Sequence, residues 1–274
     1  LAGNTTIETN TAGSQTLDGD ITVTGTTNAT GSETLTINSG SGAVEFGLLI
    51  GSTDGLGTVA INTTTGSGNE ATGTIALAGL GSADGSTTSG TDNGSTFTAG
   101  NTNTASISLD GDMYFTGGNT LFEAASGNTI DNDQNTTAVT DFITSGDTIE
   151  FKGGTLYLQD DTTGVSIATS GGAVTINSID GDHDETVTID AGAGAVTVGR
   201  IGGNNALTPA VEGIKSVSIT SSHATGITLS GNITTSDTSD SDVTLTGDVV
   251  ISGDVDIDTS QGTDGSIEFT KTIK

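Results

Sequence analysis

The chain has no cysteine and no tryptophan, and among its 274 residues there are only one proline, one methionine and five basic residues. The absence of cysteine excludes disulfide bonds and thiolate sites, which is compatible with an exported bacterial protein. Five Lys and Arg against 34 Asp and Glu give a formal net charge of −29. Because such a surface repels nucleic acids and anionic membranes, we exclude nucleic-acid binding.

Long apolar runs and helical periods are also missing. No run is long enough to span a membrane, and the one helical candidate is a single turn at Thr208–Gly213 with Pro209 in its first turn. Hydrophobic residues make up 31 % of the chain, which suits a thin core repeated along an axis better than one thick core. No signal peptide is visible and the chain begins at Leu1 rather than Met, so we expect either a removed leader or a segment of a longer chain.

What the chain does contain is repetition. Glu33–Gly47 (ETLTINSGSGAVEFG) matches Glu185–Gly199 (ETVTIDAGAGAVTVG) without a gap. Each reads as a strand, a Gly-rich turn and a second strand, because apolar and Thr residues alternate on both sides of the glycines. A unit repeated in this way marks a repeat architecture. Ile37 and Val44 should point inward, with Ile189 and Val196 at equivalent positions of another coil.

A second unit places Gly-Asp between two short strands, at Leu17–Gly25, Leu109–Gly117 and Leu245–Gly253. We therefore predict an all-β fold, a parallel β-helix or solenoid of stacked coils. Coils of roughly 20 residues, each advancing about 4.8 Å, would number on the order of 13. The alternative is a string of tandem antiparallel β-sandwich modules, since Gly-Asp turns also suit hairpins.

Three sections are expected along the chain: residues 1–80 and 161–274 as β-repeat sections, and residues 81–160 as a divergent middle, unless all three form one continuous solenoid. The polar stretch Gly81–Asn103 reads as a long loop or insertion. Met113–Gln159 holds most of the aromatic residues. They either stack in line inside a wider core, which we favour, or form an exposed platform for sugars.

The stretches Gly194–Thr235 and Asp242–Lys274 carry a resemblance. The first runs from GAVTVGRIGG through ALT to TLSGNITT, and the second reads DVTLTGDVVISGDVDIDTSQGTDGSIEFTKTIK. They resemble repeats of large bacterial surface proteins of the filamentous haemagglutinin type, often described as β-strand-repeat proteins. The resemblance implies a secreted, right-handed parallel β-helix that serves as a stalk, adhesin or surface filament. It implies no catalytic residues.

The densest acidic cluster is a candidate calcium site formed by Asp180, Asp182, Asp184 and Glu185. Hard oxygen ligands at this spacing suit Ca²⁺, although the match to an EF-hand loop is poor and a solvated acidic turn is the alternative. Asp131 and Asp133 are a weaker copy. A further acidic group, Asp254, Asp256 and Asp258, alternates with apolar residues and should line the outer face of one strand.

Catalytic chemistry finds little support. The two histidines, His183 and His223, stand in turn-like surroundings, and no nucleophile motif accompanies them. Arg200 is the only arginine, which argues against an enzyme acting on anionic polysaccharides. An enzyme that uses a pair of carboxylates on neutral glycosides is an alternative that the sequence leaves open. Six Asn-x-Ser/Thr sequons occur, at Asn4, Asn28, Asn62, Asn93, Asn135 and Asn232.

The sequence thus favours a non-enzymatic extracellular or cell-surface protein, an adhesive stalk or a filament-forming subunit. The alternative is a carbohydrate-binding or carbohydrate-active β-helix that contacts surface glycans. No cofactor beyond calcium is expected. Because a solenoid has two open ends, we expect end-to-end self-association or continuation into a longer repeat chain. The contact residues would be Leu1, Ile7, Ile267, Phe269 and Ile273.

Overall fold

The computed structural model describes residues 1–9, 18–65, 70–81, 90–91, 95–115, 118–132, 139–159, 164–182, 184–203, 213–235, 241–260 and 265–274. Some predictions fall outside these residues: most of the helical turn at Thr208–Gly213, His183, Asp133, and the sequons at Asn93 and Asn135. The chain divides into two compact units. Unit 1 comprises Leu1–Asp131 and Glu150–Thr155, and unit 2 comprises Asn132–Ile149 and Leu156–Lys274.

Short strands are the regular structure of the described residues, which contain no helix, and hence none that could cross a membrane. The strands are β1 (Thr5–Glu8), β2 (Ile21–Val23), β3 (Leu35–Asn38), β4 (Val44–Phe46), β5 (Val59–Ile61), β6 (Ile75–Leu77), β7 (Phe97–Gly100), β8 (Ile107–Leu109), β9 (Met113–Phe115), β10 (Thr120–Glu123), β11 (Thr129–Asn132), β12 (Thr140–Thr144), β13 (Ile149–Lys152), β14 (Thr155–Leu158), β15 (Gly164–Ala168), β16 (Val174–Gly181), β17 (Glu185–Asp190), β18 (Val196–Ile201), β19 (Ile214–Thr220), β20 (Ile227–Leu229), β21 (Ile233–Thr234), β22 (Val243–Thr246), β23 (Val249–Ile251), β24 (Ile257–Asp258) and β25 (Ile267–Phe269).

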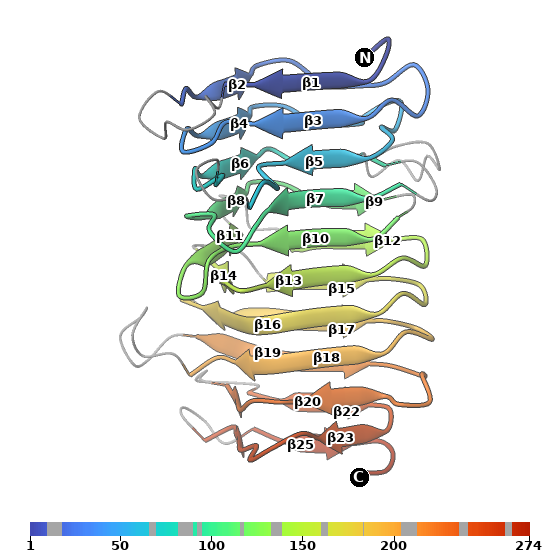
Figure 1. Cartoon of the computed structure of the whole chain (residues 1–274). Coiled ribbons are helices and arrows are strands. Elements are labelled where there is room, and N and C mark those ends of the chain that lie inside the picture. Colours follow the sequence, from blue (N-terminus) through green and yellow to red (C-terminus); the bar gives the residue numbers. More distant parts are fainter. Residues whose placement is uncertain are drawn as a thin grey trace. The chain divides into compact units, whose positions relative to one another are not determined.

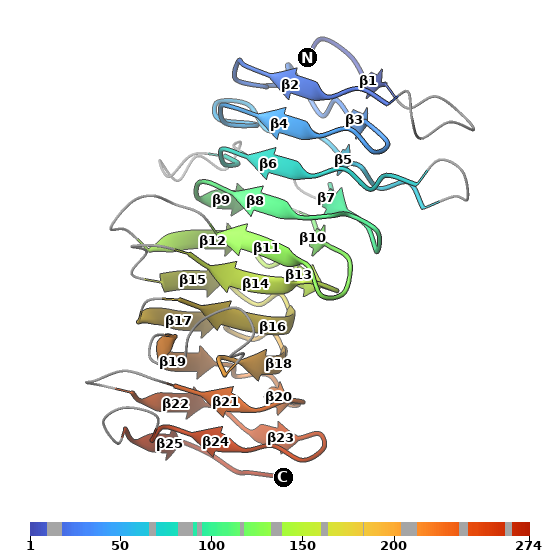
Figure 2. The same cartoon turned by 90° about the vertical axis from the view of Figure 1, so that its left-hand side faces the viewer.

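In unit 1 the coils stack into parallel ladders. One face is the ladder β1, β3, β5, β7 and β10, and the next face is the ladder β2, β4, β6 and β8. Single bridges from Thr27 to Ile50, from Ile50 to Leu80 and from Leu80 to Met113 make a third face. Figure 1 shows β1, β3, β5 and β7 one below another, and Figure 2 shows the face of β2, β4, β6 and β8.

Unit 2 repeats this plan. One face is the parallel ladder β12, β15, β17, β19, β22 and β25. The long strand β18 turns a corner: Val196–Val198 pairs with β20, whereas Ile201 pairs with Ile233 of β21. The ladders continue from β20 to β23 and from β21 to β24. The protein is therefore an all-β solenoid of stacked parallel coils, and the antiparallel sandwich alternative is wrong.

The core follows the alternation that the sequence predicts. Ile37, Val44, Ile189 and Val196 are each at most 1 % exposed, while the Thr residues between the apolar positions of their strands point away from the core. Burying one such side chain stabilises the fold by about 1.5–3 kcal/mol.

The predicted equivalence of the two fifteen-residue units is wrong. β3 belongs to an 18-stranded sheet, whereas β17 belongs to a separate 7-stranded sheet. The repeat Glu33–Gly47 therefore turns one corner of the coil, and the repeat Glu185–Gly199 turns a different corner. A strand, a tight glycine turn and a strand fit any corner, so similar sequences need not occupy the same face.

Coil length also departs from the prediction. Val174 pairs with Val196, 22 residues later, and Val59 pairs with Phe97, 38 residues later. Coils are longer than the predicted 20 residues, so the chain makes fewer of them than 13. The stretch Gly81–Asn103, which we expected to be a loop, contains β7, whose Phe97 is fully buried. Sequence analysis misses this strand because it is short and its neighbours in the sequence are polar.

Glycines allow the coils to approach closely at their corners. A Cβ added to Gly73 would lie 1.8 Å from the carbonyl oxygen of Gly42, and one added to Gly194 would lie 1.9 Å from that of Gly172. Contacts this short are impossible, so both positions require glycine. The Gly-Asp pairs at Gly111–Asp112 and Gly247–Asp248 join β8 to β9 and β22 to β23, as predicted, but as corners rather than hairpins.

Candidate functional site

The aromatic residues of the middle section lie in the core, except for Tyr114, which is half-buried. In unit 1, Phe122 lies between Phe97, with ring centroids 5.6 Å apart, and Phe151, with ring centroids 5.3 Å apart and planes nearly parallel. Phe97 also meets Phe115 edge to face at 5.7 Å. In unit 2, Phe142 is fully buried and Tyr157 is 9 % exposed. The preferred interpretation, rings stacked in line inside the coils, is confirmed, and the exposed aromatic platform is wrong.

The predicted calcium ligands take up different surroundings in unit 2. Asp180 and Glu185 are buried, at 2 % and 0 % exposed, whereas Asp184 is exposed. The backbone N–H of Asp182 donates to Oε1 of Glu185 at 3.3 Å. Within the described ranges, no group of three or more His, Cys, Asp or Glu is arranged to hold a metal ion. Calcium binding by this cluster stays a prediction.

Arg200 forms an ion pair with the acidic cluster, and the sequence analysis did not predict this pair. Its Nη1 lies 3.1 Å from Oδ2 of Asp180 and donates to the carbonyl oxygen of Gly202 at 2.5 Å. β16 and β18 are adjacent strands, so this ion pair joins one coil to the next. Breaking a buried pair leaves an uncompensated charge, which is why we assign Asp180 and Arg200 a structural role.

Two lysines make similar pairs between neighbouring strands or turns. Lys152 Nζ lies 2.9 Å from Oε1 of Glu123 in unit 1, and Lys274 Nζ lies 2.7 Å from Oδ2 of Asp248 in unit 2. Three of the five basic residues of the chain therefore pair with a carboxylate about one coil earlier. The sequence holds no signal for these pairs, because the strand register must be known first.

Short acceptor side chains join successive coils as well. In each case an Asp or Asn oxygen accepts the backbone N–H of a residue 23 to 30 positions later, at 2.7–3.1 Å. The pairs are Asn4 with Thr34, Asp18 with Ser41, Asp20 with Ala43, Asn28 with Thr53, Asn232 with Asp256, and Asp242 with Ser266. These side chains satisfy backbone donors where a corner leaves them without a ladder partner.

The same bonds account for the sequons within the described residues. Asn4, Asn28 and Asn232 each use Oδ1 to bind the next coil. Asn62 is fully buried, and its Oδ1 accepts the backbone N–H of Ser39 at 2.9 Å. All four of these Asn side chains therefore bond a backbone N–H of a neighbouring coil.

The third acidic group lies beside an open depression in unit 2. Asn232, Ile251, Gly253, Asp254, Val255 and Asp256 line this depression. Asp254 and Asp256 are exposed and precede β24 rather than lying on one strand with Asp258, so that part of the prediction is wrong. Oδ1 of Asp258 accepts from the N–H and the hydroxyl of Ser260, at 2.8 and 2.6 Å. Oδ2 of Asp131, in unit 1, accepts from the Thr129 hydroxyl at 2.9 Å.

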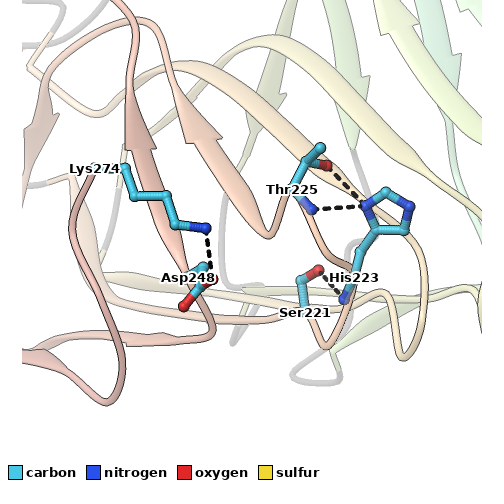
Figure 3. A network of polar contacts seen from close by, with 5 residues as sticks. All are labelled: Ser221, His223, Thr225, Asp248 and Lys274. Atoms are coloured by element: carbon cyan, nitrogen blue, oxygen red, sulfur yellow. Dashed lines mark hydrogen bonds and ion pairs between the residues drawn. The ribbon is translucent and has the colours of Figure 1, made fainter.

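His223 lies in a turn of unit 2, where its contacts are to Ser221 and Thr225 (Figure 3). Its Nδ1 accepts the backbone N–H of Thr225 at 3.2 Å and lies 2.7 Å from the Thr225 hydroxyl. The Ser221 hydroxyl donates to the carbonyl oxygen of Gly194 at 2.7 Å and accepts the backbone N–H of His223. Ser221 is therefore not oriented toward the imidazole as a nucleophile would be.

The geometry thus offers a thin apolar core, a polar outer surface and many bonds that join neighbouring coils. No family model matches the chain, and no curated protein or solved structure matches it. On the strength of its fold, the chain is a β-solenoid, an architecture compatible with β-helix repeat proteins.

Proposed function

We propose that this chain is a non-enzymatic structural or adhesive segment of an extracellular surface fibre, serving as a stalk or as a filament-forming subunit. The observation that carries the proposal is that carboxylates able to act in catalysis are paired with basic side chains instead. Carboxylates that could act in catalysis, such as Asp180 and Glu123, pair with Arg200 and Lys152. In the described coils, polar side chains form hydrogen bonds and ion pairs between neighbouring coils, as expected of a scaffold.

The resemblance to large bacterial surface repeats supports the same proposal. Gly194–Thr235 and Asp242–Lys274 carry that resemblance, and they form successive coils of unit 2 from β18 to β25. The net charge of −29 keeps such a surface soluble and hydrated. We infer an extracellular or cell-surface location from these features together.

Self-association is part of the proposal. Ile7 is 37 % exposed, Ile267 43 % and Ile273 52 %, while Leu1 and Phe269 are half-buried. β1 pairs with β3, and β25 pairs with β22, so the other edge of each strand can accept a further strand. We infer that further coils, from the same chain or from a second copy, cover these edges.

Electron microscopy and sedimentation velocity of the purified chain test the self-association. We expect fibres or concentration-dependent oligomers, which Ile7→Thr with Ile267→Thr should reduce. Leu48→Thr is the matched control, because Leu48 is 48 % exposed and lies away from both edges. A monomer at all concentrations would contradict the self-association. Hydrolysis of a neutral glycan by the chain would contradict the non-enzymatic assignment.

One observation favours the carbohydrate alternative, namely the depression with the exposed carboxylates Asp254 and Asp256. Two carboxylates beside an open surface are the minimum that glycoside chemistry needs. Binding on a glycan array that Asp254→Asn with Asp256→Asn abolishes would support this alternative. An array without binding would count against a carbohydrate-binding role.

A further inference from the structure

The segment Gly265–Lys274 of unit 2 is fastened at both ends by carboxylates. At one end, Oδ1 of Asp242 accepts the N–H and the hydroxyl of Ser266, both at 2.7 Å. At the other end, Oδ2 of Asp248 accepts from Lys274 Nζ at 2.7 Å. Between these points β25 pairs with β22 in the register Val243–Ile267 to Leu245–Phe269, and further backbone hydrogen bonds join Thr270 to Leu245 and both Thr272 and Lys274 to Val249.

Apolar burial contributes less to this segment than to the coils before it. Ile267 is 43 % exposed and Ile273 is 52 % exposed, whereas Val243 and Val249, their partners in the preceding coil, are fully buried. The segment also contains Lys271 and Lys274, two of the five basic residues of the chain. On a molecule with a net charge of −29, these cations are attracted to the acidic coil beneath them.

We propose that Asp242 and Asp248 form an acid-sensitive latch that holds Gly265–Lys274 against the preceding coil and releases it when both carboxylates are protonated. Release uncovers the edge of β22, where Val243 and Leu245 lie, and leaves a parallel strand edge open to another strand. The inference is independent of the proposed function, because it concerns one segment and its fastening.

The direction of the response follows from the bonds. Hydrogen bonds from the N–H and hydroxyl of Ser266 lower the pKa of Asp242 below its ordinary 3.8. The hydrogen bond from Lys274, together with the charges of Lys274 and Lys271, lowers the pKa of Asp248 in the same way. The latch is therefore complete above pH 3.8 and is lost as the pH falls below 3.8 through the lowered values.

Other charged groups flank the latch. The strands on either side of Asp242 carry Lys215 in β19 and Glu268 in β25. The turn beside Asp248 carries His223 (Figure 3), and the segment itself carries Lys271. Protonation of the remaining carboxylates in acid also removes the negative field that attracts Lys271 and Lys274, so it acts in the same direction as the latch.

A single engineered cysteine reports on the latch, because the chain has no other cysteine. A spin label at Thr272→Cys follows the segment, and the same label at Thr228→Cys in β20 follows the body of unit 2. At neutral pH we expect both labels to be immobile. Well below pH 3.8 the label at residue 272 should lose its immobile component while the label at residue 228 keeps it.

Neutral variants separate the latch from general acid effects. Asp242→Asn with Asp248→Asn should mobilise the label at residue 272 already at neutral pH. Asp254→Asn, which removes an exposed carboxylate elsewhere in unit 2, should leave that label immobile. The latch is overturned if the double variant stays immobile at neutral pH, or if both labels are released together in acid.

Discussion

Lys152 Nζ lies 2.9 Å from Oε1 of Glu123, across the adjacent strands β13 and β10 of unit 1. The side chain of Glu123 is only 10 % exposed, whereas that of Lys152 is 52 % exposed. The carboxylate is therefore withdrawn from water, and the ammonium reaches it from the surface. Without Lys152, a charge would remain desolvated within the stacked coils.

We expect Lys152→Met to destabilise the chain by about 1–2 kcal/mol, less than the ~3–5 kcal/mol for a wholly buried pair, because Lys152 is solvated. Chemical denaturation measures this. The double variant Lys152→Met with Glu123→Gln should recover most of the loss, since it removes the unpaired charge. If Lys152→Met unfolds at the wild-type denaturant concentration, the pair contributes nothing.

The Lys152–Glu123 pair also predicts that the stability of the chain changes at alkaline pH. The hydrogen bond to Glu123, aided by the carboxylate charges of Glu123 and Glu150, raises the pKa of Lys152 above its ordinary 10.5. Its contribution to stability is complete below pH 10.5 and is lost as the pH rises through the raised value. The stability difference between wild type and Lys152→Met should therefore shrink above pH 10.5 and stay constant below it, which melting curves at several pH values would show.

Gly73, at a corner of unit 1, gives a third prediction. Gly73→Ala would place a Cβ 1.8 Å from the carbonyl oxygen of Gly42, so the two coils must separate there. We expect a loss of about 1–3 kcal/mol, the usual cost of overpacking, or more if the ladder breaks. Gly25→Ala is the matched control, because an added Cβ there has no atom within 4 Å and should leave the unfolding midpoint unchanged.

These positions show how far the sequence predicts the fold. Alternation of apolar and Thr residues was enough to assign Ile37 and Val44 to the core, because a strand has a period of two. It could not assign β3 and β17 to their sheets, because the same turn fits every corner. Nor could it show the length of each coil, since insertions between strands leave the alternation unchanged.

The candidate sites were less predictable. An acidic cluster such as Asp180 to Glu185 looks alike in sequence whether it binds a cation from solvent or an arginine of the next coil. The distinction requires the register that brings Arg200 beside Asp180. The coil-bridging role of Asn4 and Asn232 likewise depends on residues 24 to 30 positions away, beyond the reach of a local motif.

The phenylalanine stack predicts a large effect of truncation. Phe122 is fully buried between Phe97 and Phe151, so Phe122→Ala removes ring contacts on both sides. We expect a loss of about 3–5 kcal/mol, measured by denaturant unfolding. Phe122→Leu should lose less, because it leaves a smaller cavity. Leu48→Ala, at a site 48 % exposed, should change stability by no more than about 0.5 kcal/mol.

Calcium provides the last prediction. The carboxylates of a chain with a net charge of −29 repel one another, and bound divalent cations would relieve that repulsion. Asp180 pairs with Arg200 and Glu185 is buried, so the exposed Asp184 is the member of the cluster best placed to meet a cation from solvent. Because the described residues hold no group of three ligands, the effect should require roughly millimolar Ca²⁺, as in weak extracellular sites.

Thermal melts in CaCl₂ and in NaCl of matched ionic strength test this prediction. We expect Tm to rise more in CaCl₂, and we expect Asp184→Asn to reduce the difference between the two salts. Asp254→Asn removes an exposed carboxylate outside the cluster and should preserve that difference. Equal effects of the two salts on the wild-type chain would mean that cations act by screening alone, since screening depends on ionic strength and not on a site.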